Sequence, residues 1–235
     1  MLTKKQLLEK IKSLKGTQLK GSTKFSKRKK DDGQFGRLLE EALGVKENND
    51  QNADYQCADG VVELKTHLVN STSPVSLFTK EPAWNSDKGF NRIYDVIVQF
   101  PTSNSGGVIR CNTTITNTSN NKGLRIVVDD KSEKISIVNS SSEVIGHWTY
   151  DQLRSKLNQK CGDSVIVVLR NEQGFVLDAE LYSGGDFDNM KKMLRDGRMV
   201  IDIRAKTGAS KKNRGTAFRT KSEYMPELFK GVDNE

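Results

Sequence analysis

The chain has 235 residues, enough for one large domain or for a main domain with a lobe. Lysine and arginine number 38 against 30 acidic residues, so the formal net charge is +8 and an anionic partner is favoured, with nucleic acid the first candidate. The three cysteines lack C-x-x-C spacing, which argues against a disulfide framework and a zinc site. No apolar run reaches the roughly 20 residues of a membrane helix, and no secretory signal is recognisable. A cytoplasmic protein is therefore expected.

The first third of the chain predicts two helices around a basic segment. Residues 3–15 have the apolar spacing of a short amphipathic helix. The segment 20–30, KGSTKFSKRKK, is either a solvated tract or a contact to phosphate. A second helix is expected over residues 34–43. Glu40 falls at the margin of its apolar face, directly above Gly36, and can look into a cleft.

The next segment places charged groups where a metal-dependent nuclease needs them. Residues 61–67 alternate like a strand, so Glu63, Lys65 and His67 share one face. Asp54, nine residues before Glu63, can fold back from the preceding turn to complete a cation site. Two carboxylates suit Mg²⁺, and the lysine can meet a phosphate oxygen or a water. Taken alone, the spacing is more typical of an exposed strand face than of a metal site.

The rest of the chain predicts mostly short strands. They are expected over residues 76–80, 92–100, 108–115, 124–128, 134–138, 144–148, 163–169, 175–182, 199–205 and 216–220. The strand over 163–169 is nearly all apolar and should be the most buried. Helices are expected over 150–159 and 187–196. Together these elements predict a single mixed α/β or α+β domain around one central sheet.

Residues 199–220 form a second constellation of charged groups. In the first strand Ile201 and Ile203 face one way, while Asp202 and Arg204 face the other. A basic loop and the closing strand supply further polar groups: Lys206, Lys211, Lys212, Asn213, Arg214 and Arg219. Such a β-ribbon can read the major groove, since Arg pairs with guanine and Asn with adenine. The alternative is a solvated basic hairpin.

Four blocks in order resemble the MvaI/BcnI-type restriction endonucleases, relatives of the MutH mismatch-repair nicking enzyme. The blocks are FGRLLE (35–40), ADY with VELKTH (53–55 and 62–67), SLFTKEP (76–82), and VIDIR with GTAFR (200–204 and 215–219). They frame about 200 residues, and the middle of the chain matches only in outline. The resemblance implies a PD-(D/E)xK core, with a central mixed sheet flanked by helices. It also implies two lobes and a DNA cleft: a catalytic lobe over about residues 20–100 and a recognition lobe with the 199–220 ribbon.

The resemblance also implies catalytic roles. Asp54 and Glu63 would bind Mg²⁺, for which Mn²⁺ could substitute, and Lys65 would lie at the scissile phosphate. Glu40 would be the supporting helix carboxylate. Lys65 would supply a fixed positive charge, and a proton relay if burial lowered its pKa. Asp59, four residues before Glu63, is a rival metal ligand, although Asp59 and Gly60 form a typical turn pair.

By the same resemblance, Arg204 and Arg219 would contact G·C pairs. Relatives often place a histidine where this chain has Lys212, Asn213 and Arg214, so the central base pair of the target stays open. His67 and Lys80 are further candidates for contact with DNA.

The implied activity is Mg²⁺-dependent hydrolysis of double-stranded DNA at a short, G·C-flanked site of the CC-N-GG kind, leaving 5′-phosphates. The enzyme would act as a monomer without an obligate protein partner, beside a companion DNA methyltransferase in a bacterial or archaeal cell. Two alternatives remain: a MutH-like nicking enzyme, and a non-catalytic basic DNA-binding protein.

Overall fold

A computed structural model describes residues 1–20, 33–45 and 53–233. Apart from Lys20, the basic segment 20–30 lies outside the described residues. The chain divides into two compact units. Unit 1 comprises residues 1–75, 157–186 and 229–235, and unit 2 comprises residues 76–156 and 187–228. In the described part of the chain, no helix is both long and apolar enough to cross a membrane.

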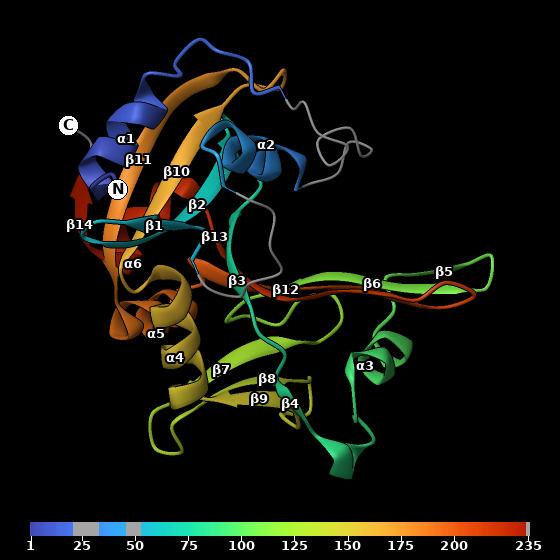
Figure 1. Ribbon diagram of the computed structural model, residues 1–235. Helices are drawn as coiled ribbons and strands as arrows, with labels where there is room; N and C mark the ends of the chain where they lie inside the picture. Colours follow the sequence, from blue (N-terminus) through green and yellow to red (C-terminus); the bar gives the residue numbers. More distant parts are fainter. Residues whose placement is uncertain (21–32, 46–52, 234–235) are drawn as a thin grey trace. The chain divides into compact units, whose positions relative to one another are not determined.

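Unit 1 is built on a five-stranded mixed sheet (Figure 1). Its strands, in spatial order, are β1 (Tyr55–Cys57), β2 (Gly60–Leu68), β10 (Ser164–Arg170), β11 (Val176–Gly185) and β14 (Phe229–Asp233). β2 and β10 are parallel, and the other pairs are antiparallel. Val165 to Val168 on β10 are at most 1% exposed, which confirms the prediction of a deeply buried strand there.

Two helices cover the sheet of unit 1. α1 (Lys4–Lys12) packs on β11 and β2, and α2 (Gln34–Ala42) packs on β2 (Figure 1). Their leucines meet Val62 and Leu64 of β2 in one apolar core. The Thr3 hydroxyl caps α1 by accepting the backbone N–H of Gln6. Both predicted helices are confirmed.

The turn between β1 and β2 ties α1 to the sheet. Asp59 accepts the backbone N–H of Lys4 at 2.9 Å, and Asp163 accepts that of Val61 at 2.6 Å while its carboxylate also pairs with the Lys4 ammonium. Gly60 adopts φ +137°, and a Cβ there would lie 2.0 Å from a carboxylate oxygen of Asp163. Only glycine fits this position.

Unit 2 contains two further sheets. The first has the order β3 (Val75–Thr79), β13 (Lys212–Thr220), β12 (Met199–Gly208), β6 (Val108–Ile115) and β5 (Ser103–Ser105). The second has the order β4 (Ala83–Trp84), β9 (Val144–Thr149), β8 (Lys134–Val138) and β7 (Arg125–Asp129). The remaining elements are helical: η1 (Ser86–Lys88), α3 (Ile93–Gln99), α4 (Tyr150–Cys161), α5 (Phe187–Arg195), η2 (Ser222–Tyr224) and α6 (Met225–Leu228). The residues of α4 from Leu157 onward belong to unit 1.

Three aromatic side chains join the two sheets of unit 2. Phe218 on β13 stacks on Phe78 of β3 with ring centroids 4.9 Å apart. The Trp148 ring of β9 meets Phe218 edge-on at 5.2 Å, and its indole N–H donates to the Lys80 carbonyl at 3.1 Å. Because Trp148 and Phe218 are fully buried, this cluster anchors the base of the β12–β13 ribbon.

The strand predicted over residues 92–100 is wrong, because this segment forms the helix α3. Its β-branched residues favour a strand, but Ile93, Val96 and Ile97 are buried at helical spacing while Val98 is 57% exposed. The Asp95 carboxylate accepts the backbone N–H groups of Asn91 and Arg92, at 2.9 and 3.1 Å. A capped, one-sided apolar face outweighs local strand propensity.

The mixed fold class is confirmed, although the strands are distributed over three sheets and not one. The other expected strands and helices are present with ends shifted by a few residues. The short strands β1, β4, β5 and β14 were not predicted. Lys212, Asn213 and Arg214 were expected in the basic loop of the ribbon. They lie in a strand, because β13 begins at Lys212.

Removing the cap of α3 should destabilise unit 2. We expect Asp95→Ala to lower the free energy of unfolding by about 1 kcal/mol, because two backbone N–H groups lose their acceptor. Urea unfolding followed by circular dichroism measures the change. Asp87→Ala, at an exposed position in η1, is the matched control and should leave the midpoint unchanged. Equal effects of the two substitutions would contradict the capping role.

Candidate active site and nucleic-acid interface

Glu63 lies between two ammonium groups in unit 1. It is 2% exposed, and its Oε1 pairs with the Lys65 Nζ from the same face of β2. Its Oε2 accepts from the Lys160 Nζ at 3.0 Å. Lys160 belongs to the last turn of α4. The two-residue spacing of Glu63 and Lys65 therefore brings their charges together as the alternation predicted.

Asp54 lies beside this pair. Its Oδ2 accepts the backbone N–H of Leu64 at 2.9 Å, so the chain folds back onto β2 as expected. Burial raises the pKa of Asp54, and the negative charge of Glu63 raises it further, while Lys65 and the Leu64 N–H oppose this shift. A desolvated carboxylate next to another carboxylate favours a cation between them.

Glu40 on α2 belongs to the same electrostatic cluster. Burial raises the pKa of Glu40, and the charges of Asp54 and Glu63 add to the shift, whereas Lys65 lowers it. The side chain is half-buried, in contrast to that of a plain surface glutamate. Glu40 is thus a third carboxylate that interacts electrostatically with Asp54 and Glu63.

Lys65 remains charged in this setting. Burial alone would lower its pKa, but the charge and hydrogen bond of Glu63, with a further contribution from Asp54, raise it above the ordinary value. The lowered pKa on which the predicted proton relay depended is not found, because Glu63 holds the Lys65 ammonium in its charged form. Nearby Cys161 is neutral, since burial raises the pKa of its thiol to about 12.

Two further candidates from the sequence have other electrostatic neighbours. Asp59 is occupied in the turn that holds α1, where it accepts the backbone N–H of Lys4, and its charge raises the pKa of the Cys57 thiol. His67 is 8% exposed, and burial together with the charge of Arg170 lowers the pKa of its imidazole. Contact of His67 with DNA stays a prediction.

The donor set fits a hard divalent cation held by few protein ligands. Within residues 1–20, 33–45 and 53–233, no cluster of three or more His, Cys, Asp or Glu side chains is close enough to hold a metal ion. Mg²⁺ commonly uses one or two carboxylates, with water and substrate phosphate completing its octahedron. Asp54 and Glu63 match that pattern, and their mutual repulsion is what a cation would relieve.

A second buried acid organises the ribbon of unit 2. Asp202 on β12 is 2% exposed, and its Oδ2 pairs with Arg219 of β13 and, at 3.0 Å, with Arg204. Its Oδ1 accepts the hydroxyl of Thr114 at 2.6 Å. Arg219 is 9% exposed, whereas the Arg204 side chain is 43% exposed. Asp202 thus fixes both guanidinium groups and leaves Arg204 accessible.

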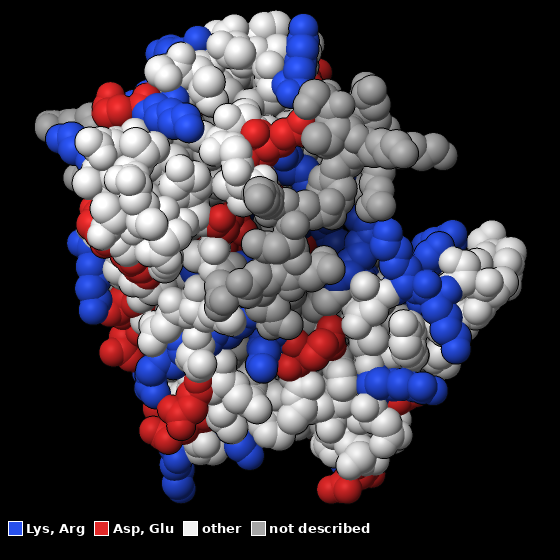
Figure 2. Space-filling view, in the orientation of Figure 1, with Lys and Arg blue, Asp and Glu red and all other residues white. Residues whose placement is uncertain are grey.

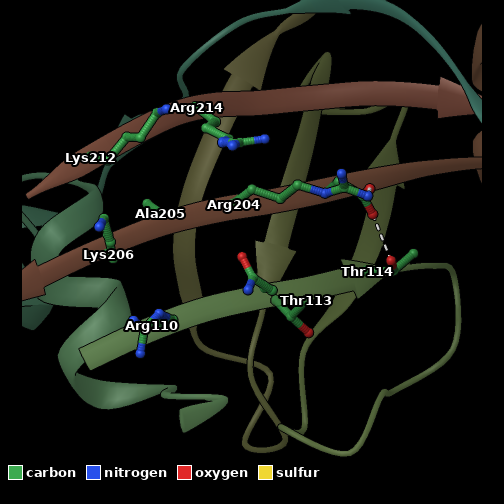
Figure 3. Close-up of a pocket in the computed structure, with 10 residues that line it drawn as sticks. Arg110, Thr113, Thr114, Arg204, Ala205, Lys206, Lys212 and Arg214 are labelled. Atoms are coloured by element: carbon green, nitrogen blue, oxygen red, sulfur yellow. Dashed lines mark hydrogen bonds and ion pairs between the residues drawn. The ribbon is translucent and has the colours of Figure 1, made fainter. Parts of the chain in front are cut away.

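A polar pocket of about 600 Å³ opens on this face of the ribbon (Figure 3). Its basic lining comes from three neighbouring strands, with Arg110 on β6, Arg204 and Lys206 on β12, and Lys212 and Arg214 on β13. Figure 2 shows lysine and arginine side chains gathered over β6 and β12. A concave surface with this charge suits an anionic ligand such as nucleic acid.

The remaining DNA-binding candidates have different surroundings. Lys212 and Arg214 are exposed at the pocket. Asn213 is held locally, because its amide oxygen accepts the Gly215 N–H at 2.7 Å and its amide nitrogen donates to Glu81 at 3.2 Å. Lys80 binds Thr216 and Trp148 through its backbone, and its side chain is half-buried.

Lys160 and Arg110 were missed as candidates by sequence reasoning. No motif marks either residue. Lys160 reaches Glu63 because α4 ends shortly before β10, whose first residue, Ser164, lies opposite Val62 of β2. Arg110 reaches the pocket because β6 pairs with β12. Only the strand order, which the sequence did not predict, could have identified them.

Cleaving DNA at chosen sites requires a centre that acts on a phosphodiester and a surface that reads bases. Carboxylates beside a charged lysine suit the first task, and a basic ribbon suits the second. The match to a family model makes the class definite, since residues 8–229 match the model of the MvaI/BcnI restriction endonuclease family. The chain belongs to this family of site-specific endonucleases, as its four sequence blocks predicted.

Solved structures support the fold. The chain is similar to restriction endonuclease MvaI in complex with its cognate DNA, with a TM-score of 0.75 and 19% sequence identity over 97% of this chain and 95% of that one. It is also similar to MvaI in the absence of DNA, with a TM-score of 0.53 and 20% identity over 84% and 85% of the two chains. No curated protein matches the sequence.

The crowded carboxylates predict a stability cost that depends on pH. Because the pKa of Asp54 is raised on folding, the folded protein loses stability as pH rises through that raised value. We expect Asp54→Asn to increase the melting temperature at pH 8 in EDTA, since the amide keeps an acceptor for the Leu64 N–H and removes the charge. The gain should shrink as pH falls from 8 through the raised pKa of Asp54, because the wild-type carboxyl then becomes protonated.

Differential scanning calorimetry across this pH range measures the effect. Asp59→Asn is the matched control, because it changes an aspartate of the neighbouring turn, and it should show no gain at pH 8. A melting temperature of Asp54→Asn below that of the wild type at pH 8 would contradict the electrostatic account.

Proposed function

We propose that this protein is a Mg²⁺-dependent Type II enzyme that hydrolyses double-stranded DNA at a short, G·C-flanked site of the CC-N-GG kind. The observation that carries the proposal is the buried carboxylate of Glu63, paired with Lys65 and electrostatically coupled to Asp54. Carboxylates beside an ammonium match the needs of phosphodiester hydrolysis, because the negative charge that develops on the phosphate requires nearby positive charge.

In the proposed reaction, Asp54 and Glu63 hold the cation. Mg²⁺ bound there would lend positive charge to the phosphate and to the attacking water. Lys65 adds a fixed charge beside a non-bridging phosphate oxygen. Glu40, whose pKa is raised, is suited to accept the proton of the water. The water oxygen forms a bond to phosphorus while the bond to the 3′ oxygen breaks, leaving a 5′-phosphate and a 3′-hydroxyl.

Sequence reading is assigned to unit 2 and cleavage to unit 1. Arg204 and Arg219 are proposed to face guanines of the target, since a guanidinium donates two hydrogen bonds to guanine O6 and N7. Asp202 supports this by fixing the guanidinium groups in place. Lys80, Lys212 and Arg214 are proposed to contact the DNA backbone, as is the basic segment 20–30, and Asn213 to lie near the central base pair.

The cellular setting follows from the class of enzyme. An endonuclease that cuts its own host's DNA requires protection of the sites, so a companion DNA methyltransferase is proposed. No other protein partner is needed for the reaction. The enzyme is proposed to act in the cytoplasm as a monomer that cuts the two strands in turn.

Substitution at the proposed centre should separate cleavage from binding. We expect Glu63→Ala and Lys65→Ala each to lower the cleavage rate by at least about 10²-fold, because the first removes a proposed cation ligand and the second removes a fixed positive charge at the phosphate. Binding to the same DNA in Ca²⁺ should persist. A plasmid cleavage assay and a gel-shift assay measure the two properties, with Asp87→Ala as the surface control. Unaltered cleavage by folded Glu63→Ala protein would refute the assignment.

Plasmid digestion should separate a restriction enzyme from a nicking enzyme. With purified protein and Mg²⁺ alone, we expect linear DNA with breaks at discrete sites, and sequencing of the ends gives both site and cut position. Persistent nicked circles would favour a MutH-like enzyme. Binding without cleavage in Mg²⁺ or Mn²⁺ would favour a non-catalytic DNA-binding protein.

The monomer proposal has its own measurement. Light scattering should give a mass near 26.3 kDa for the free protein. A protein mass near twice this value would contradict a monomer that cuts both strands in turn. On a cognate duplex, the protein mass is the mass of the complex after the mass of the DNA has been subtracted.

A further inference from the structure

The polar face of β12 continues across the neighbouring strand β6. Asp202, Arg204 and Lys206 alternate on one face of β12. Their partners across the antiparallel pair are Thr114, Asn112 and Arg110, in that order. Directly paired side chains in such a ladder have Cβ atoms about 5 Å apart. β6 thereby adds a second row of polar groups parallel to the row on β12.

Asn112 is the amide of this face that is available for a ligand. It is exposed at the pocket, between the buried residues Cys111 and Thr113 that fix the orientation of the strand. Its backbone N–H donates to the Thr102 hydroxyl at 3.0 Å. Within the described part of the chain, its side-chain amide forms no hydrogen bond. Asn213, by contrast, is engaged with Gly215 and Glu81.

The chemistry of Asn112 complements that of Arg204. An asparagine amide offers one donor and one acceptor, which match N7 and the N6 amino group of adenine, whereas arginine offers two donors for guanine. The two residues are direct partners in the ladder, so their Cβ atoms lie about 5 Å apart. Successive base pairs are separated by about 3.4 Å. The pair can therefore address neighbouring bases.

The cations beside Asn112 place a DNA backbone at one end of this row. Arg110 lies opposite Lys206 on β12, and Lys206 lies opposite Lys212 on β13. Like charges directly opposite each other destabilise a sheet, and the described residues supply no ion pair to any of the three. A phosphate group would offset this repulsion, and it would hold the bases over Asn112 and Arg204.

We propose that Asn112 is a specificity-determining residue that reads an adenine in the base pair next to the guanine contacted by Arg204. The proposal rests on the proposed function, because it requires that the ribbon reads a specific DNA site. In a target of the CC-N-GG kind, this adenine would belong to the central base pair, beside an inner guanine. Arg110, Lys206 and Lys212 then contact phosphates without reading sequence.

The test is selection from a random double-stranded DNA library by the full-length protein in Ca²⁺, followed by sequencing of the bound fraction. Wild-type protein should select a site with adenine at one defined position next to a guanine. Asn112→Ala should reduce the preference for adenine at that position by about 10- to 100-fold. Asn104→Ala, at an exposed position of β5, is the matched control and should select the wild-type site.

The remaining outcomes are equally decisive. If Asn112→Ala selects the wild-type site, with or without a uniform loss of affinity, the proposal is overturned while sequence-specific binding stands. If wild-type protein selects no site at all, the proposed function fails together with it. Arg110→Ala should bind every sequence more weakly and reduce the dependence of log affinity on log salt by about one, with the base preferences kept. A changed base preference in Arg110→Ala would contradict its role as a phosphate contact.

Discussion

A buried carboxylate is tolerated only where positive charge meets it, and Glu63 meets this requirement between Lys65 and Lys160. Much of unit 1 serves this contact. β2 supplies Lys65 on the same face, and the parallel pairing of β2 with β10 brings the end of α4, with Lys160, to the other carboxylate oxygen. Asp54 then shares the same field. Glu63 and Lys65 are therefore held in place by sheet register.

Unit 2 contains a similar arrangement of one buried acid between two cations. One buried aspartate, Asp202, is surrounded by two guanidinium groups and a hydroxyl. Removing either partner of such a group leaves an uncompensated buried charge, so the arginines are fixed before any ligand arrives. Preorganised side chains lose less conformational entropy on binding. In both units a buried acid orients the cations next to it.

The local features of the protein could be predicted from its sequence, and the long-range ones could not. The Glu63–Lys65 pair follows from alternation along a single strand, and the fold-back of Asp54 from a short turn. The helix α3 was missed because its β-branched residues favour a strand locally. The burial of Ile93 and Val96 on one helical face outweighs this preference. Lys160 and Asn112 depend on strand neighbours that lie far away in the sequence. Their places follow from topology, which periodicity does not encode.

The parallel pairing of β2 and β10 also bears on how the chain folds. Leu64 and Ile166 are neighbours in the sheet although about 100 residues separate them, and residues 76–156, all in unit 2, are synthesised between them. Contacts of such high sequence separation form slowly, because the loop must close before any of its pairing energy is gained. During synthesis, Val62 and Leu64 of β2 therefore lack their β10 partners until β10 has left the ribosome. The strand that carries Glu63 and Lys65 therefore gains its β10 neighbour only after residues 76–156 of unit 2 have been synthesised.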